Sequence, residues 1–498
     1  MKKALALILT LALTLPLFAC GGGASSLLTT GEAETQIRTT APTVTAETGG
    51  GQHDPTGPAV GYARAVVNPP MGTPLSGYGN EALRLSKTIL DDLYATCVAL
   101  RDEAGETLIL FNIDIAVMPE AQADSFRHVV TKATGVPEEN VIFSGTHTHS
   151  GPVTTGNDSA VAVWQKTAYA AIREAALAAV ADLDHVTSAS VGWADGENIN
   201  FTRRYFAEDG FVAPNYDSRT GNGKILAHEF EADPRVQAVR FVRENQKDVV
   251  LTNWQCHATM TGGSTKYDVS ADFVGAFRKE AESALDCHFM YFQGGAGNVA
   301  PSSRLEGETL YTSKEDVGKA LQKTLSAALD AAQPLSRGKV QATVQTFSGR
   351  INHETDAMVS DAQKVQNVWK QDANMSAAMV EARKYGITSP YEANAIVARA
   401  GLGETAEMKL HALSFGELAF VTAPGEMFSN TARDVMDASP FTVTFYVGYA
   451  EGHVGYVPAA SSFPNKGYEV VICKFVQGTA EEIAAAQLDM LNGLHAGI

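Results

Sequence analysis

From about residue 60 onward, short apolar runs rich in β-branched residues alternate with longer segments of helical periodicity. The expected strands are Leu93–Leu100, Thr107–Val117, Asn140–Ser144, Val249–Cys256, Cys287–Phe292, Leu418–Thr422 and Phe441–Val447. The expected helices are Glu120–Thr134, Ser159–Ala181, Ala271–Leu285, Ser313–Ala332, Asp356–Tyr385 and Ala480–Leu494. Such alternation predicts an α/β (mixed α+β) fold, in which helices flank buried mixed sheets. No internal repeat or linker interrupts it, so we expect one large domain.

The charge balance excludes some classes of partner. The chain carries 38 Lys and Arg against 56 Asp and Glu, a formal net charge of −18. Nucleic-acid binding needs clustered cations to neutralise phosphates, and the body of the chain has no such cluster. A chain that is 45% hydrophobic and 19% charged is also unlike a disordered protein. These numbers favour a folded protein that does not bind nucleic acid.

The N-terminus is typical of an exported protein. A cationic start precedes the apolar run Ala4–Ala19, which is too short to span a bilayer and predicts a signal peptide over residues 1–19. Leu17–Cys20 resembles a bacterial lipobox, in which the cysteine is lipidated, so we expect Cys20 to carry a lipid anchor on the extracytoplasmic face of a membrane. The alternative is a plain signal peptide in which Cys20 is incidental. Residues 20–58, rich in Gly, Thr and Pro, predict a flexible tether to a catalytic domain over residues 59–498.

The densest polar motif follows the expected strand Asn140–Ser144. It contains His147 and His149, which in an extended chain would point to the same side. Two imidazoles so placed suit a metal ion, or a metal ion and a substrate oxygen. The HxHxDH motif of metallo-β-lactamase-like hydrolases does not fit, because Gly151 and Pro152 stand where its Asp and His would be.

Three more polar residues follow expected strands. His257 comes after Val249–Cys256, Glu426 after Leu418–Thr422, and Tyr456 beyond Phe441–Val447. Loops at strand ends can present side chains to a common cleft. Each residue alone has an ordinary structural explanation, as a surface histidine, a solvated turn glutamate or a packed tyrosine.

Several segments together resemble the neutral (non-lysosomal) ceramidase family, zinc amidases that hydrolyse the N-acyl bond of ceramide. The similar segments are Gly61–Ala65 with Ser76–Tyr78, Thr146–Pro152 (THTHSGP), Gln293–Pro301 (QGGAGNVAP), Ala423–Glu426 (APGE), Gly455–Val457 (GYV) and Tyr468–Glu469. The resemblance extends from about residue 60 to 470.

The resemblance implies roles for individual residues. Zn²⁺ would be held by His147, His257, Glu426 and Tyr456, and the catalytic His149 would bind the reacting carbonyl oxygen. Nitrogen and oxygen donors of this kind suit zinc, which lowers the pKa of a bound water to about 7. The substrate would be a small amphiphile or lipid whose head contacts Tyr468 and either Arg203 or Arg204.

The chain departs from the family pattern at three places. Ala300 stands where the family has a serine and Asn298 where it has an aspartate, so no serine nucleophile is available at that position. The segment holding Arg203 and Arg204 differs from the family's N-R-S-P, which leaves open which arginine faces the substrate. The family's C-terminal immunoglobulin-like domain is expected to be absent.

Three functions therefore remain open. The first is a zinc hydrolase of an N-acyl lipid such as ceramide. The second is a zinc hydrolase of another amide, an ester or a lactone, which Ala300 favours. The third is a catalytically silent lipoprotein that binds a ligand in the same cleft.

Overall fold

The computed structural model describes residues 44–45, 57–79, 81–208, 210–212, 224–308, 310–372 and 374–497. The predicted signal peptide, Cys20 and nearly all of the predicted tether lie outside these residues. Within the described ranges, none of the helices combines the length and the apolar character needed to cross a bilayer.

The larger of the two main sheets has the strand order β15-β13-β12-β7-β2-β4-β5-β6, with β1 on β2 and β17 on β7. Its strands are β1 (Val44–Thr45), β2 (Ala59–Val66), β4 (Tyr94–Arg101), β5 (Thr107–Ile113), β6 (Val141–Gly145), β7 (Asp184–Asp195), β12 (Arg235–Arg243), β13 (Val249–Trp254), β15 (His288–Gln293) and β17 (Gln333–Pro334). Pairing is antiparallel except for β5 with β6 and β13 with β15. The sheet is therefore mixed, as the sequence predicts.

The smaller main sheet has the order β18-β19-β20-β22. Its strands are β18 (Val340–Arg350), β19 (Thr405–Phe415), β20 (Leu418–Thr422) and β22 (Val443–Val447). Here β20 and β22 are parallel and the other pairs antiparallel. Short two-stranded sheets are formed by β3 (Thr88–Ile89) with β14 (Asp268–Val269), β8 (Phe201–Thr202) with β16 (Val299–Ala300), and β21 (Glu426–Met427) with β23 (Tyr456–Val457). A small three-stranded sheet consists of β9 (Tyr205–Ala207) between β10 (Gly210–Val212) and β11 (Ile225–His228).

The two main sheets pack face to face over a shared apolar core, and helices cover their outer faces. Strand β2 illustrates the arrangement, because Val60 and Tyr62 join the core between the sheets while Ala63 and Ala65 face helix α2 (Ser159–Ala181). Gly61 lies on the helix side, where an added Cβ would be 1.9 Å from the carbonyl oxygen of Ala179. Both faces of this strand are therefore buried, which explains why its sequence is apolar without polar alternation.

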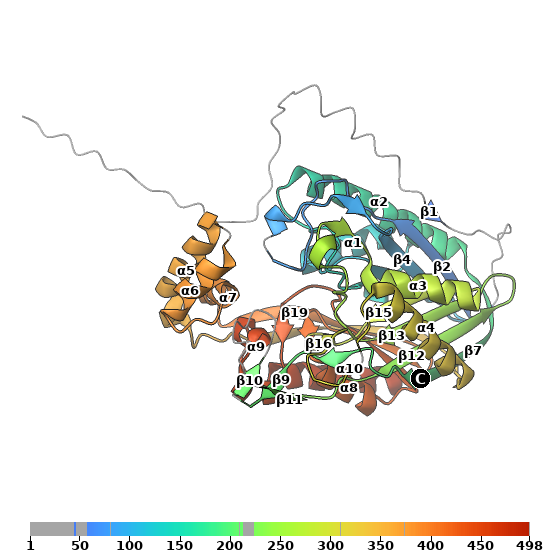
Figure 1. Cartoon of the computed structure of the whole chain (residues 1–498). Coiled ribbons are helices and arrows are strands. Elements are labelled where there is room, and N and C mark those ends of the chain that lie inside the picture. Colours follow the sequence, from blue (N-terminus) through green and yellow to red (C-terminus); the bar gives the residue numbers. More distant parts are fainter. Residues whose placement is uncertain are drawn as a thin grey trace, which may run out of the picture. The chain divides into compact units, whose positions relative to one another are not determined.

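Helices α1 to α4 cover the outer face of the larger sheet, and α8 and α10 cover that of the smaller one (Figure 1). The helices are α1 (Glu120–Thr134), α2 (Ser159–Ala181), α3 (Asp272–Leu285), α4 (Lys314–Asp330), α5 (Val359–Asp372), α6 (Met375–Arg383), α7 (Pro390–Ala400), α8 (Ser429–Ala438), α9 (Tyr468–Ile472) and α10 (Thr479–His495). Helices α5 to α7 share a small core of their own.

One predicted helix, Asp356–Tyr385, is wrong as a single element. It is divided into a 3-10 turn at Asp356–Met358 and the helices α5 and α6. Asn374 caps α6, because its side chain accepts a hydrogen bond from the N–H of Ala377 at 3.1 Å. An N-cap residue starts a new helix and so interrupts a periodic pattern that runs through it.

A buried polar cluster lies where β19 passes α1. His411 is 2% exposed, and neither ring nitrogen forms a hydrogen bond to a described residue. The Oε2 of Glu451, which is paired with Arg127, lies 3.7 Å from the Nε2 of His411, and Lys409 pairs with Asp124 nearby. Burial, and then the charges of Arg127 and Lys409, lower the pKa of His411 to about 3. The imidazole is therefore neutral at physiological pH.

Candidate metal centre

The predicted site residues follow the carboxyl ends of strands from both main sheets. His147 follows β6 and His257 follows β13, while Glu426 follows β20 and Tyr456 lies beyond β22. Backbone hydrogen bonds join the loops of the two sheets, from the N–H of Gly145 to the carbonyl of Tyr449 at 3.1 Å and from that of Gly448 to Gln293 at 2.9 Å. The site therefore forms where the ends of the two sheets meet.

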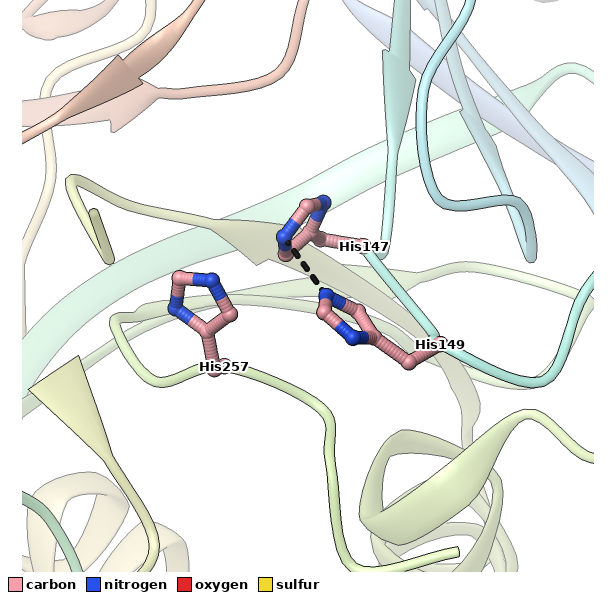
Figure 2. Close-up of side chains that lie close together, drawn as sticks. All are labelled: His147, His149 and His257. Atoms are coloured by element: carbon pink, nitrogen blue, oxygen red, sulfur yellow. Dashed lines mark hydrogen bonds between the residues drawn. The ribbon is translucent and has the colours of Figure 1, made fainter. Parts of the chain in front are cut away.

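Three histidines converge at this place (Figure 2). The Nε2 atoms of His147 and His149 are 3.1 Å apart, and the ring centroids of His147 and His257 are 4.6 Å apart. The two residues of the HxH motif do meet, but not through strand alternation. The strand ends at Gly145, and His147 has a left-handed backbone with φ of 59°. A turn, not an extended chain, brings the imidazoles together.

Backbone carbonyls fix the tautomers of two of these rings. The Nδ1 of His147 lies 2.9 Å from the carbonyl oxygen of Ala116, and that of His257 lies 2.6 Å from the carbonyl oxygen of Ala296. Because a carbonyl only accepts hydrogen bonds, each Nδ1 carries the proton and each Nε2 carries a lone pair. This is the usual orientation of metal-binding histidines, whose other nitrogen donates to a backbone or carboxylate oxygen.

Glu426 and Tyr456 complete the group. They lie opposite each other in the parallel pair β21 and β23. The Oε2 of Glu426 is 3.2 Å from the Nε2 of His257 and 3.5 Å from that of His147. The hydroxyl of Tyr456 lies 3.5 Å from the Nε2 of His257. The four side chains predicted as metal ligands are thus neighbours.

The donor set fits a metal cation. Glu426 Oε2 is buried and forms no hydrogen bond of good geometry to a described residue, although two imidazole Nε2 atoms lie within 3.5 Å of it. Burial lowers the pKa of His257 to about 4, and the charge of Arg203 acts in the same direction, so this ring is neutral. Burial alone would raise the pKa of Glu426, but His147 and His257 hold it well below its usual value. A buried carboxylate that faces the Nε2 atoms of two histidines is the environment of a zinc ligand.

His149 lies at the side of this group and is only half-buried. Burial of its imidazole, and then the neighbouring His147 and His257, lower its pKa well below the usual value. Its Nδ1 has no hydrogen-bond partner among the described residues. Its other nitrogen, Nε2, lies 3.1 Å from the Nε2 of His147 and so faces the candidate metal centre.

The two arginines have different surroundings. Arg203 donates to the hydroxyl of Tyr456 at 3.0 Å and to Glu469 at 3.0 Å, so it adjoins the metal group. Arg204 is fully buried and pairs with Glu469 and Glu229. Of the two, Arg203 is the one the structure places beside the candidate metal centre. Contact of either arginine with a substrate stays a prediction.

The remaining predicted residues lie around the same centre. The ring of Tyr468 packs edge-on against that of Tyr456, with centroids 5.7 Å apart. Ala300 pairs with Phe201 in the short β16–β8 ladder, directly after Val299, whose carbonyl oxygen lies 3.1 Å from the Nδ1 of His257. The altered position therefore follows a residue that holds a histidine of the site.

Sequence reasoning missed three supporting residues. Tyr449 stacks on His147 with centroids 3.9 Å apart. The Gln293 amide donates to the carbonyl oxygens of Thr146 and Cys256, and so joins the loops that carry the histidines. An added Cβ at Gly297 would be 2.3 Å from the carbonyl oxygen of Glu426. The glycines of Gln293–Pro301 were a usable signal, since close backbone approach requires them.

No known family profile and no curated protein matches this sequence. Solved structures do match. The crystal structure of neutral ceramidase from Pseudomonas aeruginosa is 16% identical with a TM-score of 0.67, over 89% of this chain and 75% of that one. A structure described as ceramidase complexed with C2 is 16% identical with a TM-score of 0.66, over 89% of this chain and 76% of that one. The mixed α/β fold of this chain is that of the neutral ceramidases.

Proposed function

We propose that this protein is a zinc-dependent hydrolase that cleaves the amide bond of an N-acyl lipid such as ceramide. The observation that carries the proposal is the convergence of two Nε2 lone pairs and one buried carboxylate oxygen, from His147, His257 and Glu426, beside the hydroxyl of Tyr456. The likeness of the fold to neutral ceramidases supports it.

These four residues would hold the zinc ion. When bound there, zinc would polarise a carbonyl group and lower the pKa of water, which is the chemistry that amide hydrolysis needs. The reaction adds water across the C–N bond and yields a carboxylic acid and an amine.

The residues around the ion would position the substrate and the ligands. His149 would donate a hydrogen bond to the reacting carbonyl oxygen from its Nε2, which lies 3.1 Å from the Nε2 of His147 and so faces the metal group. Arg203 would hold the oxygen of Tyr456 in place through their 3.0 Å hydrogen bond. Tyr468, packed on Tyr456, would contact the substrate head.

The test has two stages. Protein purified without added metal is expected to contain about one zinc per chain, and His147→Ala to contain much less. Wild-type protein is then expected to release fatty acid from a short-chain N-acyl-sphingosine, whereas His147→Ala does not. Absence of zinc from both proteins would contradict the proposal, and would favour a silent ligand-binding protein.

A second candidate is a hydrolase of another amide, an ester or a lactone. Ala300 favours it, because the absence of a hydroxyl removes a hydrogen bond that could orient the substrate, at a cost of about 1 to 3 kcal/mol. A zinc-loaded protein that cleaves simple esters but not N-acyl-sphingosine would support this candidate. Gain of ceramidase activity in Ala300→Ser would show that this position sets specificity.

We also propose that the protein is exported and anchored by a lipid on Cys20. The lipobox-like segment supports this location. Cys20→Ser is expected to move the protein from the membrane fraction to the soluble fraction. Retention of the variant in the membrane fraction would contradict the lipid anchor.

A further inference from the structure

A cavity of about 430 Å³ adjoins the candidate metal centre. It is lined by Tyr78, Gly79, Leu83, Arg84, Gly262, Gly263, Lys266 and Tyr267. The ring of Tyr78 packs edge-on against that of His149, with centroids 5.0 Å apart. Arg84 donates to the carbonyl oxygen of His149 at 2.6 Å. The cavity thus begins one aromatic ring away from the residue proposed to bind the reacting carbonyl.

The cavity is cationic although the chain is acidic. Arg84 and Lys266 line it, and no Asp or Glu does so among the residues that the structure describes. Lys87 adds a third cation, since its Nζ lies 4.2 Å from the centroid of the Tyr267 ring. In a chain of net charge −18, a cavity lined by two cations, with a third beside it, departs from the overall acidic balance. Such a cavity attracts an anionic group.

The buried cation of the cavity, Arg84, is held in place by hydrogen bonds. Arg84 is only 5% exposed, and its guanidinium donates to the backbone carbonyls of Ser76, His149 and Lys266 at distances of 2.5 to 2.7 Å. Its Cζ also lies 4.6 Å from the centroid of the Tyr78 ring. A buried charge held in this way is already oriented, so a ligand does not have to order it.

A series of uncharged aromatic rings also adjoins the metal centre. The Tyr468 ring contacts both Tyr456 and Tyr391, and Tyr391 contacts Trp369. Tyr391 also reaches the cavity, since a Cβ added to Gly79 would be 2.6 Å from its hydroxyl. These rings suit the apolar chain of a ligand, whereas the cavity suits an anionic group of the same ligand.

We propose that the substrate is an anionic amphiphile, an N-acyl compound whose carboxylate or other anionic group enters the cavity lined by Arg84 and Lys266. This inference rests on the proposed amide hydrolysis and narrows its substrate class. The neutral head of ceramide would bring no negative charge to the cationic cavity.

Two substrates of equal chain length test the inference. N-octanoylglycine carries a carboxylate where N-octanoylethanolamine carries a hydroxymethyl group. We expect kcat/KM to be roughly tenfold higher for the anionic compound, mainly through KM, and this preference to shrink at high salt. Lys266→Glu should remove the preference, whereas Lys323→Glu, an exposed change on α4, should preserve it.

Binding without turnover separates this inference from the proposed function. Calorimetry on the metal-stripped full-length protein is expected to show tighter binding of N-octanoylglycine than of N-octanoylethanolamine. In Lys266→Glu this difference in affinity is expected to disappear. Equal affinities, or a difference that Lys266→Glu leaves unchanged, would overturn the inference. Preferential binding without hydrolysis by the zinc-loaded protein would instead refute the proposed function.

Discussion

Glu469 offers a sharp test of how the candidate metal centre is supported. Its carboxylate is 0% exposed and accepts hydrogen bonds from Arg203 at 3.0 Å and from Arg204 at 2.8 Å. Burial alone would raise its pKa, but the two guanidinium groups hold it below the usual value. The variant Glu469→Gln keeps the size of the side chain and removes its charge.

The expected loss of stability follows from the burial of this pair. The amide of a glutamine would place an N–H donor against an N–H donor of one guanidinium group, so one hydrogen bond would be lost. Arg203 would also lose its ion pair, although it would keep its hydrogen bonds to Tyr456 and Gly297. Removing one partner of a buried ion pair costs about 3 to 5 kcal/mol. For an unfolding entropy of about 2.1 cal/mol/K per residue over roughly 440 residues, this lowers Tm by about 3 to 5 °C.

Thermal unfolding followed by circular dichroism measures the effect, and Glu482→Gln is the matched control. Glu482 pairs with Arg350 on the surface, where the side chains are 47% and 65% exposed, so its loss should lower stability by less than about 0.5 kcal/mol. Equal Tm values for Glu469→Gln, Glu482→Gln and the wild type would refute the argument that the buried network stabilises the fold.

Two further changes test other parts of the structure. Gly297→Ala should displace Glu426, since the new Cβ would be 2.3 Å from its carbonyl oxygen, and should weaken zinc affinity by about 10- to 100-fold in a chelator competition assay. Gly403→Ala is the control, because nothing lies within 4 Å of its added Cβ; equal zinc affinity for both variants would contradict the steric argument. His411 has a pKa of about 3 in the folded protein, below its unfolded value, so the folded state loses stability as pH falls below about 6.5. In urea unfolding, His411→Gln should lose about 2.5 kcal/mol less than the wild type between pH 7 and pH 4.5, and equal losses would show that His411 does not titrate in this way.

Local patterns in the sequence predicted much of the fold. Helices Glu120–Thr134 and Ser159–Ala181 have the predicted bounds, because each has helical periodicity between clear ends. The expectations omitted β7 and β12. Strand β7 pairs with β2, which is distant in the sequence, and its residues alternate irregularly, whereas β12 pairs with β13, the next strand along the chain. The prediction of a single helix over Asp356–Tyr385 was wrong, because Asn374 caps a new helix inside a segment whose composition is helical throughout.

The site was predicted only in part. The four suggested ligands lie together, but the residues that orient them were not visible as a pattern. Tyr449 and Gln293 act through contacts with residues more than a hundred positions away, such as His147 and Thr146. The roles of Arg203 and Arg204 could not be separated either, since only the hydrogen bond from Arg203 to the hydroxyl of Tyr456 shows which one adjoins the metal group.

The candidate ligands come from both main sheets, His147 and His257 from one and Glu426 from the other. A cation bound by all three would link the two main sheets to each other. Any opening that separates the ends of the sheets would have to release the ion first. Since a ligand stabilises the state that binds it by RT ln(1 + [L]/Kd), metal supply and resistance to unfolding would rise together. The same site would then govern both the chemistry of the protein and its resistance to unfolding.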